Sequence, residues 1–279
     1  MPVCSNDTGL WGYISSGGRL EIACVYESVS PFNSNGFAVV KQDGVYKVIV
    51  DSGYTYGLDE LGIQDVVGIN NKYVLAKYND KYGYYNYDFQ CVSNAHQYDQ
   101  ITVNNVGYAA VGNDGKWGFI SDSGEIMSEM VFDDIALNSL GYVFTRINYS
   151  PEQEIPVGCA KRSDVWYLVY PDGSKITETG FAGLKAPEGN GWVAASDAEG
   201  KWGFVDLDGT VQIPFQYEDA WSFSENLAAV KKDGEWVYIN IYNDVVIDEN
   251  FENALPFHGG IAQAHEDAGI ALLSLVYVG

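Results

Sequence analysis

The sequence predicts an all-β repeat protein, and three observations carry that prediction. One pattern returns seven times in 279 residues: a turn, an aromatic anchor, usually a glycine, and a short apolar run. Successive anchors lie 34 to 36 residues apart, with one longer step. No segment places apolar residues at the 3.6-residue period of a helix. A fixed period of this length is typical of small units that bury their apolar faces against one another. The anchors are Trp11, Tyr46, Tyr82, Trp117, Trp166, Trp202 and Trp236.

Each unit is expected to form a three- or four-stranded antiparallel meander. In the last complete unit, residues 227–231 form a first strand. The dipeptide Asp233-Gly234 follows, and it favours a tight hairpin turn. Residues 236–240 then form the second strand, and residues 244–247 open a third. A short edge segment and a linker lead to the next unit. About seven such units are expected.

The first strands of the units read as runs of small apolar residues. They are expected over 37–41, 73–77, 108–112, 157–161, 192–196, 227–231 and 261–265. If the last of these pairs beside residues 10–15, the array closes into a β-propeller-like ring, because radial repetition protects the sheet edges. The alternative is an open β-solenoid array. It is favoured because known propeller repeats run to about 40–50 residues, and because residues 270–278 have no evident place in a ring.

One junction is longer than the others. Trp117 and Trp166 are 49 residues apart, so about fourteen residues are inserted, mainly over 146–157. We expect this insertion to be a surface loop, since extra residues in one repeat usually map to a loop on one face. Residues 1–279 are expected to form a single repeat domain.

Two units carry a resemblance to a known family. Residues 114–120 read Asp-Gly-Lys-Trp-Gly-Phe-Ile, and residues 200–206 read Gly-Lys-Trp-Gly-Phe-Val-Asp. This unit resembles the bacterial WG (KWG) repeat family, and the resemblance covers nearly the whole chain. Tyr46 and Tyr82 stand where the family has tryptophan. The resemblance implies a repeat fold, and it implies no activity, so it brings no catalytic residue with it.

The charge of the chain restricts its partners. There are 15 Lys and Arg residues against 38 Asp and Glu residues, a net charge of −23, and 47% of residues are hydrophobic. Disorder requires low hydrophobicity as well as high charge, so the acid must lie on the surface of a folded body. A negative field repels nucleic acid and anionic membranes and attracts basic proteins. The predicted partner is therefore a basic protein, and binding to nucleic acid or to a membrane is not expected. The charge does not predict the oligomeric state.

The cysteines and the chain ends exclude other classes. The four cysteines are scattered without a CxxC pair, which predicts no zinc site or redox motif. No metal and no other cofactor is expected. Residues 1–8 lack the basic and apolar regions of a secretory signal, and residues 269–279 are too short to span a bilayer. A cytoplasmic location is predicted.

Carboxylates and two tryptophans are the candidate partner-binding residues. The carboxylates recur in one register, so they would form a row on one face; either each caps a turn through backbone N–H groups, or the row receives a basic partner. Asp65 is a degenerate member. Two tryptophans lie outside the repeat register, which suits an interface, whereas the anchors are expected in the core. The candidates are Glu27, Asp99, Asp133, Asp134, Glu218, Asp219, Glu252, Trp192 and Trp221.

No catalytic residue is predicted. The histidines are His96, His258 and His265, and their spacing matches no metal-binding motif. His258 is expected to be a packed or turn residue. The chain is therefore expected to be a non-catalytic protein-interaction module, in its sharper form an immunity or antitoxin-type protein that neutralises a basic toxin or enzyme. The alternatives are a carbohydrate- or cell-envelope-binding module that uses exposed aromatics, and an unrecognised hydrolase.

Overall fold

The structure is a computed structural model that describes residues 1–15, 17–51, 55–57, 63–69, 73–86, 98–150, 153–266 and 269–275. Within these ranges, no helix has the length and apolar character needed to cross a membrane. The chain divides into two compact units, one of residues 1–103 with 123–125 and one of residues 104–122 with 126–279. The single-domain organisation stays a prediction.

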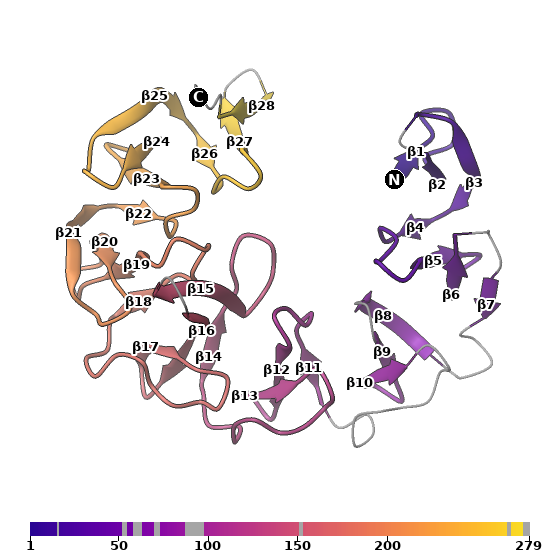
Figure 1. Cartoon of the computed structure of the whole chain (residues 1–279), viewed down its shortest axis with the longest axis horizontal. Coiled ribbons are helices and arrows are strands. Elements are labelled where there is room, and N and C mark those ends of the chain that lie inside the picture. Colours follow the sequence, from indigo (N-terminus) through magenta and orange to yellow (C-terminus); the bar gives the residue numbers. More distant parts are fainter. Residues whose placement is uncertain are drawn as a thin grey trace. The chain divides into compact units, whose positions relative to one another are not determined.

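The first unit is built from small antiparallel sheets (Figure 1, indigo to purple). Its first two sheets run in the orders β1-β2-β3 and β4-β5-β6-β7, and its third in the order β10-β9-β8. The strands are β1 (Pro2–Cys4), β2 (Trp11–Ile14), β3 (Leu20–Tyr26), β4 (Ser28–Val29), β5 (Phe37–Gln42), β6 (Val45–Val50), β7 (Thr55–Gly57), β8 (Ile63–Ile69), β9 (Tyr73–Tyr78), β10 (Lys81–Asn86) and β11 (Gln100–Ile101).

The second unit repeats the same meander (Figure 1, magenta to yellow). Its sheets include β18-β19-β20-β21, β22-β23-β24-β25 and β26-β27-β28. The strands are β12 (Tyr108–Asn113), β13 (Lys116–Ser121), β14 (Asp134–Ala136), β15 (Phe144–Ser150), β16 (Gln153–Arg162), β17 (Val165–Val169), β18 (Gly183–Leu184), β19 (Val193–Ser196), β20 (Trp202–Val205), β21 (Val211–Tyr217), β22 (Asp219–Ala220), β23 (Leu227–Lys232), β24 (Glu235–Asn240), β25 (Val245–Phe251), β26 (Asn253–Ala254), β27 (Ile261–Glu266) and β28 (Gly269–Ser274).

The predicted meander is confirmed. Every expected first strand is present, as β5, β9, β12, β16, β19, β23 and β27, and each pairs in antiparallel register with the strand that follows it. The hairpin at Asp233-Gly234 joins β23 to β24, as its sequence predicts. Periodicity and turn chemistry therefore place the strands correctly.

The expected surface loop over 146–157 is wrong. Residues 146–150 and 153–157 lie in two antiparallel strands, where β15 pairs with the first half of β16. Ile147, Ile155 and Val157 are buried in one cluster with Leu184 of a neighbouring sheet. Apolar residues at alternate positions of a strand share one face, and burial of that face holds the insertion as a strand pair.

The pairing of 261–265 beside 10–15 is also corrected. β2 pairs with β1 and β3, and β27 pairs with β26 and β28. Since a strand has two hydrogen-bonding edges, both edges of each strand are filled within its own unit. Residues 270–278 had no evident place in a ring. Of these, residues 270–274 belong to β28, the partner strand of β27, and residues 276–278 lie outside the described ranges.

In five of the seven repeats, the residue two positions after the anchor is a buried aromatic. Phe119 and Phe204 are 0% exposed, whereas the anchor Trp11 is 37% exposed. Trp202 packs on the core only in part. Residues i and i+2 share a face of a strand. Because the anchor opens its strand, it lies at the end of the sheet, and the second residue lies further inside. The expected core burial holds for Trp236 and fails for Trp11.

The glycine after the anchor is required by a bulge. Trp202 lies opposite Tyr217 and Phe204 opposite Ile213, so β21 carries extra residues against β20. A Cβ at Gly203 would lie 2.6 Å from the carbonyl oxygen of Ile213. Such close backbone approach favours glycine within a strand.

Candidate functional site

The acids of the repeated register hold hairpin turns. The Glu27 carboxylate accepts the N–H of Gly44 at 2.9 Å, and the Glu218 carboxylate accepts that of Gly234 at 3.2 Å. Each glycine belongs to the hairpin turn of the next sheet. The sequence left two roles open for these acids, a turn cap or a contact with a partner. At Glu27 and Glu218 the structure shows the turn cap.

Asp133 follows the same rule. It accepts the N–H of Ser163 at 2.7 Å and bonds the Lys116 ammonium. The Lys116 side chain, followed by the Ser163 N–H, holds the pKa of Asp133 below its usual value. Asp99 is paired with Lys81 in the same manner. These acids are therefore engaged within the fold.

In two repeats a second acid follows the turn-capping acid directly, and its carboxylate has a different role. Asp134 and Asp219 each accept the N–H of the following residue, at 2.9 and 2.8 Å. Asp65 does the same and also accepts the Tyr46 hydroxyl at 2.7 Å. Glu252, by contrast, is exposed, and its carboxylate makes no hydrogen bond or ion pair within the described ranges. It remains available to a partner.

Trp221 is occupied by a lysine of the same chain. The Lys185 ammonium lies 5.0 Å from the ring centroid of Trp202 and 5.3 Å from that of Trp221. It also lies 3.3 Å from the Asp219 carboxylate. Two aromatic rings and one carboxylate thus hold a cation in place.

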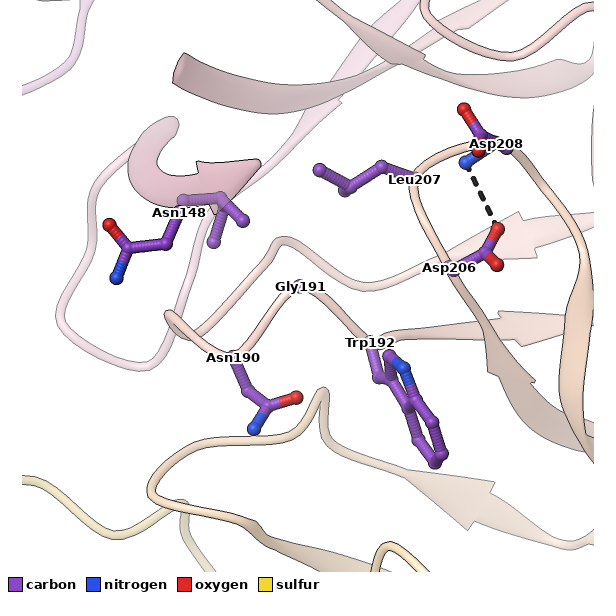
Figure 2. Close-up of a pocket in the computed structure, with 8 residues that line it drawn as sticks. Asn148, Asn190, Gly191, Trp192, Asp206, Leu207 and Asp208 are labelled. Carbon is purple, nitrogen blue, oxygen red and sulfur yellow. Dashed lines mark hydrogen bonds between the residues drawn. The ribbon is translucent and has the colours of Figure 1, made fainter. Parts of the chain in front are cut away.

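Trp192 lines an open pocket of about 260 Å³. Its walls come from the inserted hairpin, from the linker before β19 and from the turn between β20 and β21. The Trp192 ring packs edge-on against Phe223, with the centroids 5.5 Å apart. Figure 2 shows the side chains of Asn190 and Trp192 leaving the chain on the same side of Gly191. The lining residues are Ile147, Asn148, Asn190, Gly191, Trp192, Asp206, Leu207 and Asp208.

A second polar cluster joins three linkers of the second unit. Glu188 is 6% exposed and accepts both the N–H and the hydroxyl of Ser139, at 2.7 and 2.9 Å. The Ser139 hydroxyl lies 2.8 Å from Nε2 of His258. Burial raises the pKa of Glu188 to about 7, against the two bonds from Ser139. Burial lowers the pKa of His258, while Glu225 opposes that shift.

This cluster lacks the geometry of a hydrolytic triad. In a triad the acid bonds one imidazole nitrogen and the nucleophile bonds the other. Here Glu188 lies 3.3 Å from the same Nε2 that contacts Ser139, so the serine is shared between acid and base. The arrangement fixes the three linkers together. His258 pairs with Ile261 across a turn, as its sequence context predicts.

Sequence reasoning named Trp192 as a partner-binding residue and His258 as a packed or turn residue, and it did not name the other residues of either site. A glutamate directly between Pro187 and Gly189, in a short linker, is the signal that could have marked Glu188. The described residues contain no group of His, Cys, Asp and Glu side chains that could hold a metal ion. His96 and Cys91 lie outside those ranges.

Solved structures resemble the fold. A eukaryotic initiation factor is 9% identical, with a TM-score of 0.59 over 98% of this chain and 84% of that one. Sqt1 of Saccharomyces cerevisiae is 13% identical, with a TM-score of 0.48 over 88% of this chain and 82% of that one. The WD40 domain of Neurospora crassa Pan2 is 9% identical, with a TM-score of 0.40 over 91% of this chain and 90% of that one. The predicted fold class, an all-β repeat of propeller-like meanders, is confirmed.

No curated protein matches the sequence. A family model for the WG containing repeat matches residues 11–46, 82–117, 117–149 and 202–236. Each matched region begins at an anchor of the predicted period, and the bulge opposite Gly203 explains the glycine that the family's name records. The chain therefore belongs to the WG-containing repeat family.

Proposed function

We propose that this chain is a non-catalytic binding module that receives a basic protein partner. A repeat β-rich fold of this class supports a binding module. The sharper form of the proposal is an immunity or antitoxin-type protein that covers the cationic surface of a toxin or enzyme.

One observation carries the choice of a basic partner. The sheet β22–β25 and the residue after it expose six carboxylates, and none of them has an ion pair within the described ranges. They are Asp233, Glu235, Asp244, Asp248, Glu249 and Glu252. Unpaired like charges repel one another and destabilise the folded state, so a cationic partner would relieve them. The turn-capping acids, in contrast, are already engaged.

The experiment is a salt-dependent capture. The chain is immobilised and exposed to extract of its own source at low salt, and bound proteins are eluted by rising salt. We expect basic proteins to elute within the physiological range, because the field is screened over about 8–10 Å there. A variant with Asp244, Asp248 and Glu249 changed to Asn and Gln should bind less of the same proteins and associate more slowly. Binding of acidic or neutral proteins alone, or binding unaffected by salt and by this variant, would contradict the proposal.

A further inference from the structure

The last sheet of the second unit, β26–β28 (Figure 1, yellow), has a neighbouring sheet on one face. Successive residues of a strand point to opposite faces of their sheet. In β24, Ile239 belongs to the core cluster shared with β18–β21, and Tyr238 belongs to the cluster shared with β26–β28. Ala262 and Ala264 of β27 lie in that second cluster. Among the described residues of this unit, no further sheet covers the opposite face of β27 and β28.

That opposite face is apolar and exposed. Leu272 and Ile270 of β28 are 74% and 63% exposed, and Ile261 of β27 is 52% exposed. Leu272 lies opposite Gln263 of β27, so alternate residues of the two strands build one surface. The end of a repeat array normally carries a polar outer face, since an exposed apolar strand recruits another chain. The surface around Leu272 is therefore one that a partner would cover.

Leu272 takes the place that a buried aromatic has in the sheet before. It is the fourth residue of β28, as Tyr238 is the fourth residue of β24. Tyr238 lies opposite Ala229 of β23, and Leu272 has the matching position opposite Gln263 of β27. Tyr238 is 0% exposed. The two positions are equivalent in register, and they differ in what covers them.

A phenylalanine from the next linker covers this position in the two preceding sheets. The ring centroids of Phe223 and Phe204 are 4.7 Å apart, and those of Phe257 and Tyr238 are 5.1 Å apart. Both phenylalanines are buried. Phe223 also shares a core cluster with Ala194, which lies opposite Phe204. The phenyl ring thus packs on a cross-strand pair of residues.

In the last sheet, an open pocket of about 260 Å³ lies at the equivalent pair. Gln263 and Leu272 both line it. Sites for drug-sized ligands run to about 300–1,000 Å³, so a pocket of this size suits a single side chain. Its other walls are mainly apolar and come from β27 and from two linkers of the same unit. They are Ser139, Leu140, Leu255, Pro256, His258 and Ile261.

β28 also lacks the strand that pairs with the equivalent strands of the preceding sheets. β20 pairs with β21 and β24 with β25, whereas β28 pairs with β27 alone among the described residues. An antiparallel strand has hydrogen-bonding groups on both of its edges. Within those residues, the outer edge of β28 therefore offers backbone groups that no strand uses.

Elsewhere in the chain, one kind of segment covers both the edge and the face. It begins as the outer strand and ends on the covering phenylalanine. It has Val or Leu first, Ile two positions later, Tyr or Phe four positions after that, and Phe after six more. The isoleucine lies opposite the buried aromatic, as Ile247 lies opposite Tyr238. Residues 20–32, 211–223 and 245–257 follow this pattern.

We propose that β28 and the pocket beside Leu272 bind an extended segment of a protein partner that follows the same pattern. Its isoleucine pairs opposite Leu272, and its last phenylalanine enters the pocket. Strand addition takes its affinity from main-chain hydrogen bonds and its specificity from pockets for side chains. The partner is a different protein, since the three segments of this pattern are already paired in their own repeats. The site is apolar, so it goes beyond the proposed function and does not rest on it.

The test titrates a synthetic peptide with the sequence of residues 211–223 into the full chain, with calorimetry as the readout. The solution contains about 1 M NaCl, where the Debye length is about 3 Å and charge contributes little. We expect saturable binding of one peptide to one chain. A peptide with Phe223→Ala should bind at least about tenfold more weakly, because a buried aromatic anchor dominates such contacts. A scrambled peptide should not bind.

Two variants of the chain locate the peptide. Leu272→Gln should weaken binding about tenfold. Val246→Gln is the matched control, because Val246 is an exposed apolar residue on a strand of the preceding sheet, and it should change binding by less than about twofold. Both side chains are exposed, so both variants should melt like the wild type.

Three results would overturn the proposal. The first is the absence of saturable peptide binding, and the second is an equal loss in Leu272→Gln and Val246→Gln. The third is a dimer of the chain alone, seen by sedimentation, that Leu272→Gln dissociates, since a second copy would then occupy the face. None of these results bears on the basic partner, whose capture depends on low salt and on Asp244, Asp248 and Glu249.

Discussion

The two tryptophans outside the repeat register, Trp221 and Trp192, lie in the same unit, but different side chains contact their rings. Trp221 shares the ammonium of Lys185 with Trp202 and Asp219. Trp192 lines an open pocket that has no Lys or Arg among its lining residues, and its ring packs edge-on against Phe223. The first tryptophan is thus held by a lysine of the same chain, and the second by an aromatic ring. The difference teaches that tryptophans outside the repeat register need not share one role, because the residues that the neighbouring linkers bring to each ring differ.

Removing the support beneath Trp192 should have the largest effect. Phe204 is fully buried and packs on Phe223, which in turn fixes the Trp192 ring. Phe204→Ala should lower the free energy of unfolding by about 3–5 kcal/mol, measured by urea denaturation. Trp202→Ala, at the partly buried anchor, should cost clearly less. Equal losses would show that the anchor contributes as much to the core as the residue two positions later.

The second largest effect is expected at the buried Glu188, whose contribution to the free energy of unfolding should depend on pH. Its pKa of about 7 lies above the ordinary 4.5, so the folded state binds the proton more tightly than the unfolded state. That contribution to stability is complete below pH 4.5 and is lost as the pH rises through 7. Glu188→Gln keeps acceptor and donor for Ser139 and removes the charge. We expect the variant to be more stable than the wild type by about 1–3 kcal/mol at pH 8.

The same comparison at low pH is its control. At pH 5 the wild-type carboxyl is protonated, so the gap between Glu188→Gln and the wild type should shrink toward zero. His258 works in the opposite direction, because its lowered pKa makes stability fall as the pH drops below about 6.5. Because Glu188 lies 3.3 Å from Nε2 of His258, the two titrations are coupled. The comparison is therefore repeated with His258→Gln in both proteins, which removes the second titration. A gap that widens toward pH 5 would show that Glu188 is stabilised as the ion.

Removing the Lys185 ammonium from Trp202 and Trp221 should lower the free energy of unfolding by a smaller amount. Lys185→Met keeps most of the side-chain stem and removes the charge from between the two rings. We expect a loss of about 1–2 kcal/mol, the sum of two partly exposed cation–π contacts and one ion pair, measured by chemical denaturation at low and high salt. Asp208→Asn, at an exposed position that lines the Trp192 pocket, should change stability by less than about 0.5 kcal/mol. If the two variants lose equal stability, the contrast between the sites does not exist.

The smallest expected difference in stability is between a glutamate that caps a turn, Glu218, and one that does not, Glu252. Glu218→Ala removes the acceptor for the Gly234 N–H and should cost about 0.5–1 kcal/mol. Glu252→Ala, at the equivalent register position, should be neutral or slightly stabilising, since it lowers the net negative charge. The Glu252 carboxylate is exposed and has no partner among the residues that the structure describes. Thermal melts of the two variants at the same ionic strength make this comparison. A loss in both would assign Glu252 a structural contact as well.

The parts of the fold set by neighbours in sequence could be predicted. The hairpins follow from local turn chemistry, and the strands around Asp233-Gly234 follow from alternating apolar residues. The inserted hairpin could not be predicted, because prolines and acids over 151–156 resemble a loop, and only burial of Ile147 and Ile155 against another sheet makes it a strand pair. Local pattern contains no information on that contact.

The candidate site was predictable only in part, for the same reason. Trp192 stood out because it breaks the register. Asn148, which lines the same pocket, comes from the inserted hairpin of another sheet, and Ser139 and His258 meet across 119 residues of sequence. A single sequence cannot show which linkers converge. It could state that the register acids either cap turns or bind a partner, and only the hydrogen bonds of Glu27 and Glu218 distinguish the two.

The most direct measurement compares the two tryptophans in one pair of NMR spectra. The indole N–H signals of Trp192 and Trp221 are recorded for the wild type and for Lys185→Met, with Trp192→Phe and Trp221→Phe variants used to assign them. Because Lys185 lies over the Trp221 ring and Trp192 packs on Phe223, the signal of Trp221 should shift in Lys185→Met while that of Trp192 stays in place. Signals that move together, or a shift confined to Trp192, would contradict this account.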